Sequence, residues 1–214
     1  MIKEVEIKIN GGPERILWKD CELEKLKPGQ VTIEHTFVGL NFIDTYHRSG
    51  LYPLPLPTKL GMEGAGVVVA KSPDVEEYEI GDRVAYVMAL GSYSTKRNIE
   101  ANKLVKIPKS ISDQQAAAVL LKGMTVEYLV ERLFKVNSTH TVLFHAAAGG
   151  VGLLACQWLK HLGAKIIGTA GTDEKAVLAK QNGCDEVILY NRENFVEKVK
   201  YLTNDVGVDV VYDG

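Results

Sequence analysis

The stretch HAAAGGVGLLACQWLKHLGA, residues 145–164, predicts the end of a strand, a glycine-rich turn and an amphipathic helix in direct succession. Residues 141–145 supply the strand, and the turn that follows is AAGGVG, residues 147–152. The apolar residues on one face of the helix are Val151, Leu154, Ala155, Trp158, Leu159 and Leu162. A glycine turn between a strand and a helix is typical of a site for the pyrophosphate of a dinucleotide.

The turn matches the G-x-G-x-x-G fingerprint with an alanine, Ala147, in the first position. Gly149 lets the backbone approach a pyrophosphate at the amino end of the helix, where free N–H groups and the helix dipole favour anions. Gly152 lets the helix pack closely against the strand. A tight turn without a ligand is the alternative, but the series of strands and helices that follows favours a dinucleotide.

Strands and helices alternate regularly from this turn onward. We expect strands at about 141–145, 165–169, 186–189 and 208–212, and helices near 150–162, 173–182 and 193–202. Gly163 and Gly183 are placed to end the first two helices. The pattern predicts a parallel, doubly wound sheet with the strand order 3-2-1-4 and helices on both faces.

The pattern before residue 110 is different. Its apolar runs are short and separated by turns, as in a β-barrel or sandwich, and they read VEIKI, VTIEHTFVGL, GAGVVVA, DRVAYVM and KLVKIP. Ser112 and Gln115 have the spacing of a capping box, from which an alanine-rich helix runs towards Leu121, and a second helical segment follows at about 125–133. We therefore expect a β-rich domain over residues 1–122 and a β/α domain over 123–214.

Composition narrows the classes of partner. The 25 basic and 27 acidic residues give a net charge of −2, which does not favour binding to nucleic acid. The chain has neither a signal-peptide pattern at its start nor an apolar run long enough for a membrane span. Its three cysteines form no C-x-x-C pair, as expected for reduced thiols in a cytoplasmic protein.

The end of the second expected β/α strand bears on the choice of dinucleotide. NAD-binding proteins usually carry an acidic residue there, which binds the ribose 2′-hydroxyl. Residues 166–172 read IIGTAGT and contain no acid, and Lys175 follows closely. We expect NADP to be favoured over NAD, with Lys175 beside the 2′-phosphate; a solvated helix lysine is the alternative.

Five separated segments of the chain form a recognisable set. They are NFIDTYHRSGLYPLPLP (41–57), GMEGAG (61–66), GDRVAY (81–86), AAAVLLKGMT (116–125) and the opening stretch (145–164). In sequence and in order they resemble the zinc-free quinone oxidoreductases, or zeta-crystallin-like proteins, of the medium-chain dehydrogenase/reductase superfamily. The resemblance implies a GroES-like catalytic domain, the N-terminal half of a Rossmann domain that binds NADPH, and a cleft where a quinone-like acceptor is reduced.

The same segments lack a metal site. Zinc-dependent relatives carry Cys where this chain has Asn41, and G-H-E where it has Gly61, Met62 and Glu63. Asn and Met are poor replacements for these zinc ligands, and the cysteine-rich structural zinc lobe is also missing. We expect no metal, and a structural role for Glu63.

The resemblance also implies site residues. Asn41, Tyr46 and Tyr52 are the candidates for the wall of the cleft, where they would hydrogen-bond a carbonyl oxygen as negative charge develops on it. Alternatively, Asn41 bonds its own backbone in a loop, and Tyr52 only covers the barrel. Besides Gly149 and Gly152, the cofactor contacts that the family pattern implies are Asn41, Thr125, Gly150, Val151, Gly171, Lys175 and Tyr190. His145, in contrast, is expected to be a packed core residue.

Several functions stay open at this point. They are NADPH-dependent quinone reduction, NADPH-dependent reduction of enone or alkenal double bonds, and a non-catalytic structural or NADPH- or RNA-binding role. Family members continue beyond the position of Gly214, and the resemblance places the nicotinamide-side loops and a homodimer edge in that continuation. We therefore expect the 214-residue chain by itself to self-associate and to be a poor enzyme.

Overall fold

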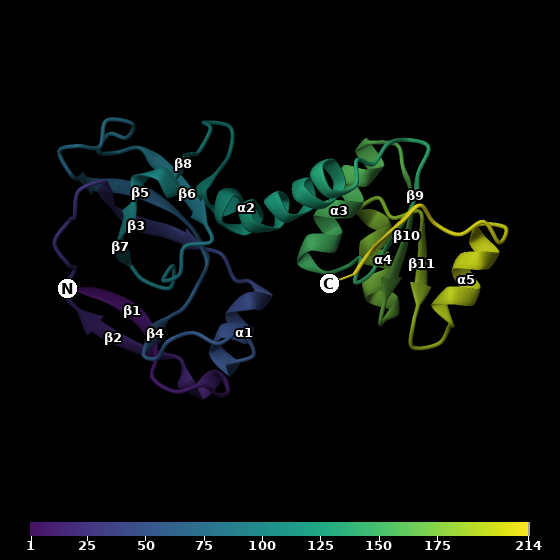
Figure 1. Ribbon diagram of the computed structural model, residues 1–214, viewed down its shortest axis with the longest axis horizontal. Coiled ribbons are helices and arrows are strands. Elements are labelled where there is room, and N and C mark those ends of the chain that lie inside the picture. The colour runs from purple at the N-terminus through teal and green to yellow at the C-terminus, as the bar shows by residue number, and fades with distance from the viewer. Residues whose placement is uncertain (214) are drawn as a thin grey trace. The chain divides into compact units, whose positions relative to one another are not determined.

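The computed structural model describes residues 1–213 (Figure 1). The chain divides into two compact units, Met1–Leu121 and Lys122–Gly214, which are described separately below. No helix within residues 1–213 is both long and apolar enough to cross a membrane.

The first unit contains two sheets. Five antiparallel strands lie in the order β7-β3-β5-β6-β8, and three more lie in the order β2-β1-β4. Their bounds are β1 Ile2–Ile7, β2 Leu17–Cys21, β3 Gln30–Val38, β4 Thr58–Lys59, β5 Glu63–Lys71, β6 Arg83–Val87, β7 Lys96–Glu100 and β8 Val105–Lys106. Apolar side chains of the larger sheet form a core that includes Val31, Ile33, Val68, Val84, Tyr86 and Ile99.

The apolar runs correctly indicated β1, β3, β5, β6 and β8, but three strands lack such a run. In β7 only Ile99 is buried, and in β2 no residue is. β4 has only two residues. These strands form because neighbouring strands offer them backbone hydrogen bonds, a contribution that side-chain periodicity does not record.

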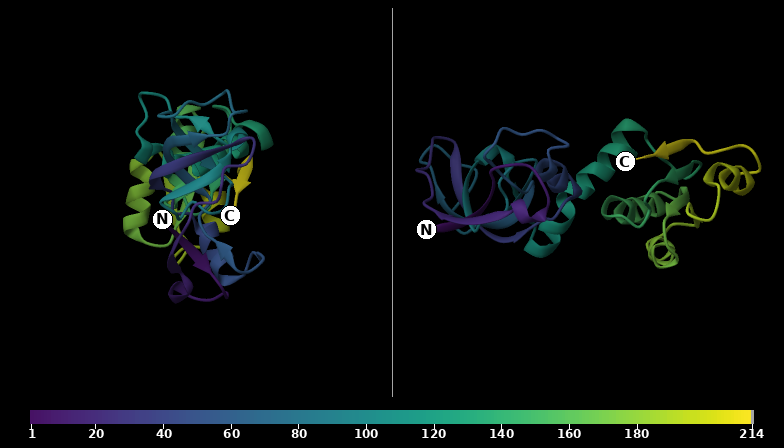
Figure 2. Two further views of the ribbon diagram at one scale, coloured as in Figure 1. Left: turned by 90° about the vertical axis from the view of Figure 1, so that its left-hand side faces the viewer. Right: turned by 90° about the horizontal axis from the view of Figure 1, so that it is seen from below.

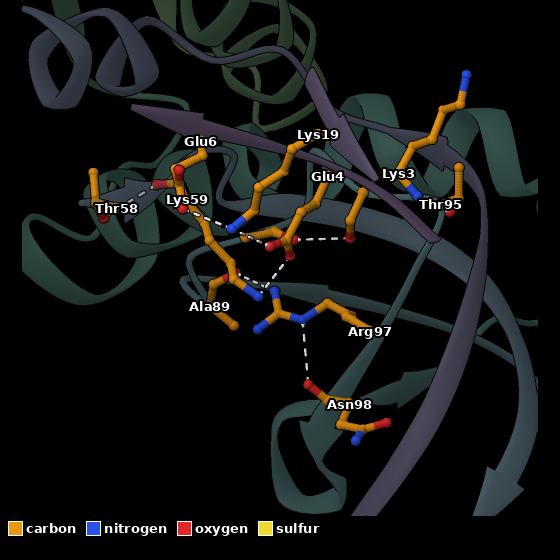
Figure 3. A network of polar contacts seen from close by, with 12 residues as sticks. Lys3, Glu4, Glu6, Lys19, Thr58, Lys59, Ala89, Thr95, Arg97 and Asn98 are labelled. Carbon is orange, nitrogen blue, oxygen red and sulfur yellow. Dashed lines mark hydrogen bonds and ion pairs between the residues drawn. The ribbon is translucent and has the colours of Figure 1, made fainter. Parts of the chain in front are cut away.

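A buried carboxylate joins the strands of the smaller sheet (Figure 3). Glu4 of β1 lies 3.1 Å from the Lys19 ammonium of β2 and 2.6 Å from the Lys59 ammonium of β4. Burial raises the pKa of Glu4, but the two lysines lower it by more, and the net shift is downward. The carboxylate therefore stays charged and holds the three strands together through ion pairs.

The segment that follows β3 forms a helix, α1 (Phe42–Ser49), which the sequence pattern did not predict. The backbone N–H of Asn41, the residue before the helix, donates to the carboxylate of Asp44 at 3.0 Å. The helix ends at Gly50, which has a φ of 84° and donates its N–H to the carbonyl of Tyr46. Capping by local polar residues thus stabilises this short helix.

The longest helix is continuous where two segments were expected. α2 runs from Asp113 to Glu127 and continues as a π-helical turn, Tyr128–Leu133. The capping box at its start is confirmed, because the N–H of Gln115 donates to the Ser112 hydroxyl and the N–H of Ser112 donates to the Gln115 side chain. Gly123 lies inside the helix and lowers its propensity without ending it. Short 3-10 turns occur at Pro13–Arg15 and Ala101–Lys103.

The second unit is a four-stranded parallel sheet in the order β11-β10-β9-β12, which confirms the predicted order. The strands are β9 Thr141–Phe144, β10 Lys165–Ala170, β11 Glu186–Leu189 and β12 Val210–Tyr212, and the helices between them are α3 Gly150–His161, α4 Asp173–Gln181 and α5 Phe195–Leu202. In Figure 1, α3 and α4 lie on one side of the sheet and α5 lies on the other, and Figure 2 gives two further views.

Side chains that alternate along the strands fill two cores. One core contains Val142, Phe144 and Ile166 together with Ala155, Cys156 and Leu159 of α3 and Ala179 of α4. The other contains Leu143, Ile167 and Ile188 together with Val199 of α5. Gly163 and Gly183 have φ values of 79° and 105° and follow α3 and α4, as predicted.

Candidate functional site

The glycine turn between β9 and α3 leaves backbone donors at the start of the helix. Gly149 is the N-cap, its backbone is extended, and no side chain caps the helix. Hydrogen bonding to the helix begins with Leu153 N–H, which donates to the carbonyl of Gly149. Gly150, Val151 and Gly152 are therefore the first three helical residues, and their N–H groups precede the intrahelical ladder. No acidic side chain occurs in this first turn, so the position suits an anion.

Gly152 has no room for a side chain. A Cβ at this position would collide with the carbonyl oxygen of Ala146 and would lie 2.7 Å from the carbonyl carbon of Ala147, both of which are backbone atoms. Ala146, the residue immediately before the glycine turn, has a left-handed φ of 51°. The glycine fingerprint did not predict this conformation. The N–H of Ala146 donates to the Thr169 hydroxyl of β10 at 3.3 Å, which helps to hold the turn.

The loops after β10 and β11 lie against each other. Tyr190 donates its N–H to the carbonyl of Ala170, and Asn191 donates its side-chain amide to the carbonyl of Gly171 at 2.8 Å. A Cβ on Gly171 would lie 2.7 Å from the Tyr190 hydroxyl oxygen. The structure thus brings together Gly171 and Tyr190, two residues that the resemblance implied as cofactor contacts.

Lys175 lies in the first turn of α4. Its N–H donates to the Thr172 hydroxyl, which caps the helix, and its side chain is exposed. β10 ends at Ala170 without an acidic residue, but Asp173 begins the helix. Arg192 holds Asp173 through two hydrogen bonds of 3.2 and 2.7 Å. Sequence reasoning missed Arg192, because only the pairing of β10 with β11 places residues 173 and 192 side by side.

In the first unit, Asn41 is buried and its side-chain amide donates to the Glu63 carboxylate at 2.8 Å. Glu63 is fully buried and also accepts the N–H of Leu121 at 2.7 Å. The expected structural role of Glu63 agrees with these contacts. The Asn41 side chain is thus bonded to a second strand, a contact that the loop alternative did not anticipate.

Tyr46 and Tyr52 form an aromatic cluster with Phe42. The two tyrosine rings are 5.0 Å apart, and the Tyr46 ring meets that of Phe42 edge-on at 5.2 Å. Tyr52 is half exposed and Phe42 is largely exposed. Sequence reasoning missed Phe42, although its spacing of four residues from Tyr46 would have revealed it once the helix was known.

Asp44 lies beside Asn41 and has a structural contact of its own. Its buried carboxylate accepts the hydroxyl of Tyr93 at 2.7 Å in addition to the Asn41 N–H. Burial raises the pKa of Tyr93, and the hydrogen bond to Asp44 raises it further. The Tyr93 hydroxyl therefore stays protonated and fixes the carboxylate at the start of α1.

The remaining expected residues occupy separate places. Thr125 is an exposed residue near the end of α2. His145 is partly buried: its ring is 3.1 Å from the Thr169 hydroxyl and packs edge-on against Phe195, in line with the expected core role. No cluster of three or more His, Cys, Asp or Glu residues within the described residues 1–213 could hold a metal ion.

Comparisons with known proteins give matches along most of the chain. The alcohol dehydrogenase GroES-like domain matches residues 27–130, and the zinc-binding dehydrogenase domain matches residues 150–214. A quinone oxidoreductase from Pseudomonas aeruginosa is 47% identical over 100% of this chain, and a 2-haloacrylate reductase from a Burkholderia species is 42% identical over 100% of it. The chain spans 66% of the length of each of these relatives.

A solved structure is similar in both units. The crystal structure of Escherichia coli quinone oxidoreductase complexed with NADPH matches with a TM-score of 0.97 and 46% sequence identity. The match covers 99% of this chain and 66% of that one.

Proposed function

The chain belongs to the quinone oxidoreductase family of the medium-chain dehydrogenases/reductases, and from this we propose that the protein reduces a quinone-like acceptor with NADPH and without a metal. The observation that carries the proposal is the glycine turn, where the backbone fills the space that a Cβ at Gly152 would need and the first turn of α3 carries no acid. Such a turn accepts a dinucleotide pyrophosphate.

The residues of the second unit fit NADPH. Gly149, Gly150, Val151 and Gly152 would hold the pyrophosphate with backbone N–H groups. Gly171, Lys175 and Tyr190 would hold the adenosine end, where the absence of an acid at the end of β10 leaves room for a 2′-phosphate. Asn41 and Thr125 are the further cofactor contacts that we propose from the resemblance. When bound, NADPH supplies the hydride.

Asn41, Tyr46 and Tyr52 are proposed to act on the acceptor. The tyrosine rings offer an aromatic surface for a quinone ring, and their hydroxyls can donate hydrogen bonds to a carbonyl oxygen on which negative charge develops. Glu63 orients the Asn41 amide by accepting its N–H. Glu63 is thus a positioning residue, since its contact is with Asn41 and not with the acceptor.

A second candidate function is the reduction of activated carbon–carbon double bonds. The 42% identity to a 2-haloacrylate reductase favours it, because the two reactions share a cofactor-binding framework and differ in the acceptor. A non-catalytic NADPH- or RNA-binding role has less support, since a net charge of −2 does not favour RNA.

The roles of the domains and the assembly are proposals of the same kind. Residues 1–122 would form the catalytic domain, and residues 123–214 the N-terminal half of the NADPH-binding domain. We also infer a cytoplasmic location and, for a protein of the relatives' length, a homodimer.

The activity is tested on a protein extended to the length of its relatives. NADPH consumption is followed with a small benzoquinone, with 2-chloroacrylate and with no acceptor. We expect the quinone to be reduced with the higher kcat/KM. Faster turnover of 2-chloroacrylate would favour the second candidate, and NADPH binding without turnover of either compound would leave only a non-catalytic role.

A further inference from the structure

The ion pair between Asp173 and Arg192 joins the two loops at the proposed adenosine end of the cofactor. Arg192 approaches both carboxylate oxygens of Asp173, at 3.2 and 2.7 Å, so the contact is bidentate. About 60% of the Asp173 side chain and 65% of the Arg192 side chain are exposed. An exposed ion pair of this kind adds little to the stability of the fold. Its position suggests an effect on a bound ligand instead.

The position of the pair makes it relevant to the 2′-phosphate. Asp173 follows the capping residue Thr172, and both come directly after Gly171, whose carbonyl accepts the Asn191 amide. The amino end of α4 attracts anions, so a carboxylate at its first residue competes with a phosphate for the same field. An unpaired Asp173 would therefore repel a phosphate bound beside it.

The other charges in this region do not cancel Asp173. Glu174 keeps its negative charge, because the Thr172 hydroxyl holds the pKa of Glu174 below its usual value and the charge of Arg192 acts in the same direction. Among residues 1–213, no carboxylate lies within ion-pair distance of the Lys175 ammonium, which leaves it available for a ligand phosphate. The start of α4 thus has two acidic residues and two basic ones close to it. Which of them form ion pairs determines the electrostatic potential that a bound phosphate meets.

We propose that Arg192 neutralises Asp173 and thereby sets the preference of this site for a 2′-phosphorylated adenosine over a 2′-hydroxyl. Without Arg192, Asp173 repels the phosphate and becomes free to accept a ribose hydroxyl, the interaction that acidic residues make in NAD-binding sites. Arg192 is in this sense a specificity-determining residue that acts through Asp173. The inference rests on the proposed binding of NADPH at this end of the second unit.

The test uses two fragments of the cofactors, adenosine 2′,5′-bisphosphate and adenosine 5′-monophosphate, titrated calorimetrically into the 214-residue chain. Arg192→Gln is expected to lower the ratio of bisphosphate to monophosphate affinity by about three- to tenfold at low ionic strength. Asp173→Asn is expected to raise the ratio. The double variant is expected to return close to the parent ratio, because both the repelling and the neutralising charge are gone.

Lys160→Gln is the matched control. Lys160 forms an ion pair with Asp185 at 2.6 Å, and Asp185 immediately precedes β11, whereas Arg192 follows the other end of that strand. This substitution should leave the ratio unchanged. Thermal unfolding of each variant separates a change in affinity from a loss of folded protein.

The possible results test the role of the Asp173–Arg192 pair separately from the binding of NADPH. A parent chain that binds the bisphosphate no better than the monophosphate would contradict both the NADPH proposal and the role of the pair. A selective parent whose ratio does not respond to Arg192→Gln and Asp173→Asn would overturn only the role of the pair. A double variant as weak as Arg192→Gln would also overturn it, by showing that Arg192 contacts the phosphate directly.

Discussion

At the scale of single residues, the Asn41 amide is oriented by a partner that is distant in sequence. The Asn41 amide donates a hydrogen bond to the buried Glu63 carboxylate, which also accepts the backbone N–H of Leu121, so the three groups form one polar cluster. The comparison with zinc-dependent relatives singled out both positions. Their hydrogen bond, however, depends on how β5 passes the end of β3, and no local sequence pattern encodes that arrangement.

We expect Glu63→Gln to lower the free energy of unfolding by about 1–3 kcal/mol. The amide that replaces the carboxylate presents its NH2 group to one of two N–H donors, so one of the two hydrogen bonds is lost. Guanidinium unfolding followed by circular dichroism measures the loss. Glu34→Gln is the control, because the Glu34 side chain forms an exposed ion pair with Lys96, and the change in stability should stay within about 0.5 kcal/mol. Equal stability of the two variants would contradict the structural role of Glu63.

The residues of the two candidate sites were predictable to different degrees. The fingerprint identified Gly149 and Gly152, because their spacing reflects a backbone requirement. Arg192 and Phe42 were not predicted. Arg192 contacts Asp173 across two neighbouring loops, and the spacing of Phe42 from Tyr46 is informative only once α1 is known to be a helix.

At the scale of secondary-structure elements, the β/α half was the most predictable part. Its buried strands and covering helices alternate in hydrophobicity, and the right-handed connection between parallel strands leaves few possible orders. β2, β4 and β7 were not predicted because they carry few or no buried apolar residues, and α1 was missed because its stability comes from capping. Hydrogen bonds to strands that are distant in sequence decide the three strands, whereas local capping decides α1.

The junction of β9 and α3 yields a prediction at this scale. Gly152→Ala should destabilise the second unit by about 2 kcal/mol or more, because the new methyl group meets backbone atoms of Ala146 and Ala147, which cannot move aside. Gly150→Ala is the control, since its Cβ would meet only the flexible end of the Lys122 side chain. Thermal unfolding measures both, and a Gly152→Ala variant as stable as Gly150→Ala would contradict the close packing.

His35 of β3 bonds to β6 and to the segment before β7, and its burial predicts a pH dependence of stability. Its ring donates through Nδ1 to the Ser94 carbonyl and accepts the Tyr86 hydroxyl at Nε2. Burial lowers the pKa of His35 to about 4, and the charge of Arg97 acts in the same direction. The unfolded chain, with a usual value of 6.5, therefore binds a proton at a higher pH than the folded chain does.

Stability supplied by the neutral His35 is present above about pH 6.5 and is lost as the pH falls towards 4. His35→Gln should lower stability at neutral pH and flatten this decline. Guanidinium unfolding at pH values across this window measures the slope, with His161→Gln as the exposed control. A slope in His35→Gln equal to that of the parent would show that other groups cause the decline.

At the scale of the whole molecule, β12 is an edge strand of the second sheet. It pairs with β9 on one side, and among residues 1–213 no strand pairs with its other side. Val211 in this strand is half exposed. An apolar edge with unpaired backbone groups favours association with a second chain.

We expect Val211→Lys to reduce self-association of the 214-residue chain, because a charged side chain at an edge opposes strand pairing. Sedimentation velocity over a range of protein concentrations measures the effect. Val177→Lys is the control, since Val177 is similarly exposed but lies on α4. A parent chain that sediments as a monomer throughout, or a variant that associates as strongly as the parent, would argue against association through this edge.

Calorimetric titration of the chain with NADPH and with NADH measures directly whether the second unit binds NADPH in preference to NADH. We expect saturable binding of NADPH and weaker binding of NADH. We also expect Lys175→Ala to narrow the difference in affinity by about tenfold or more, through loss of a charge-assisted contact with the 2′-phosphate. Equal affinities for the two cofactors in the parent chain, or the absence of NADPH binding, would contradict a preference of the second unit for NADPH.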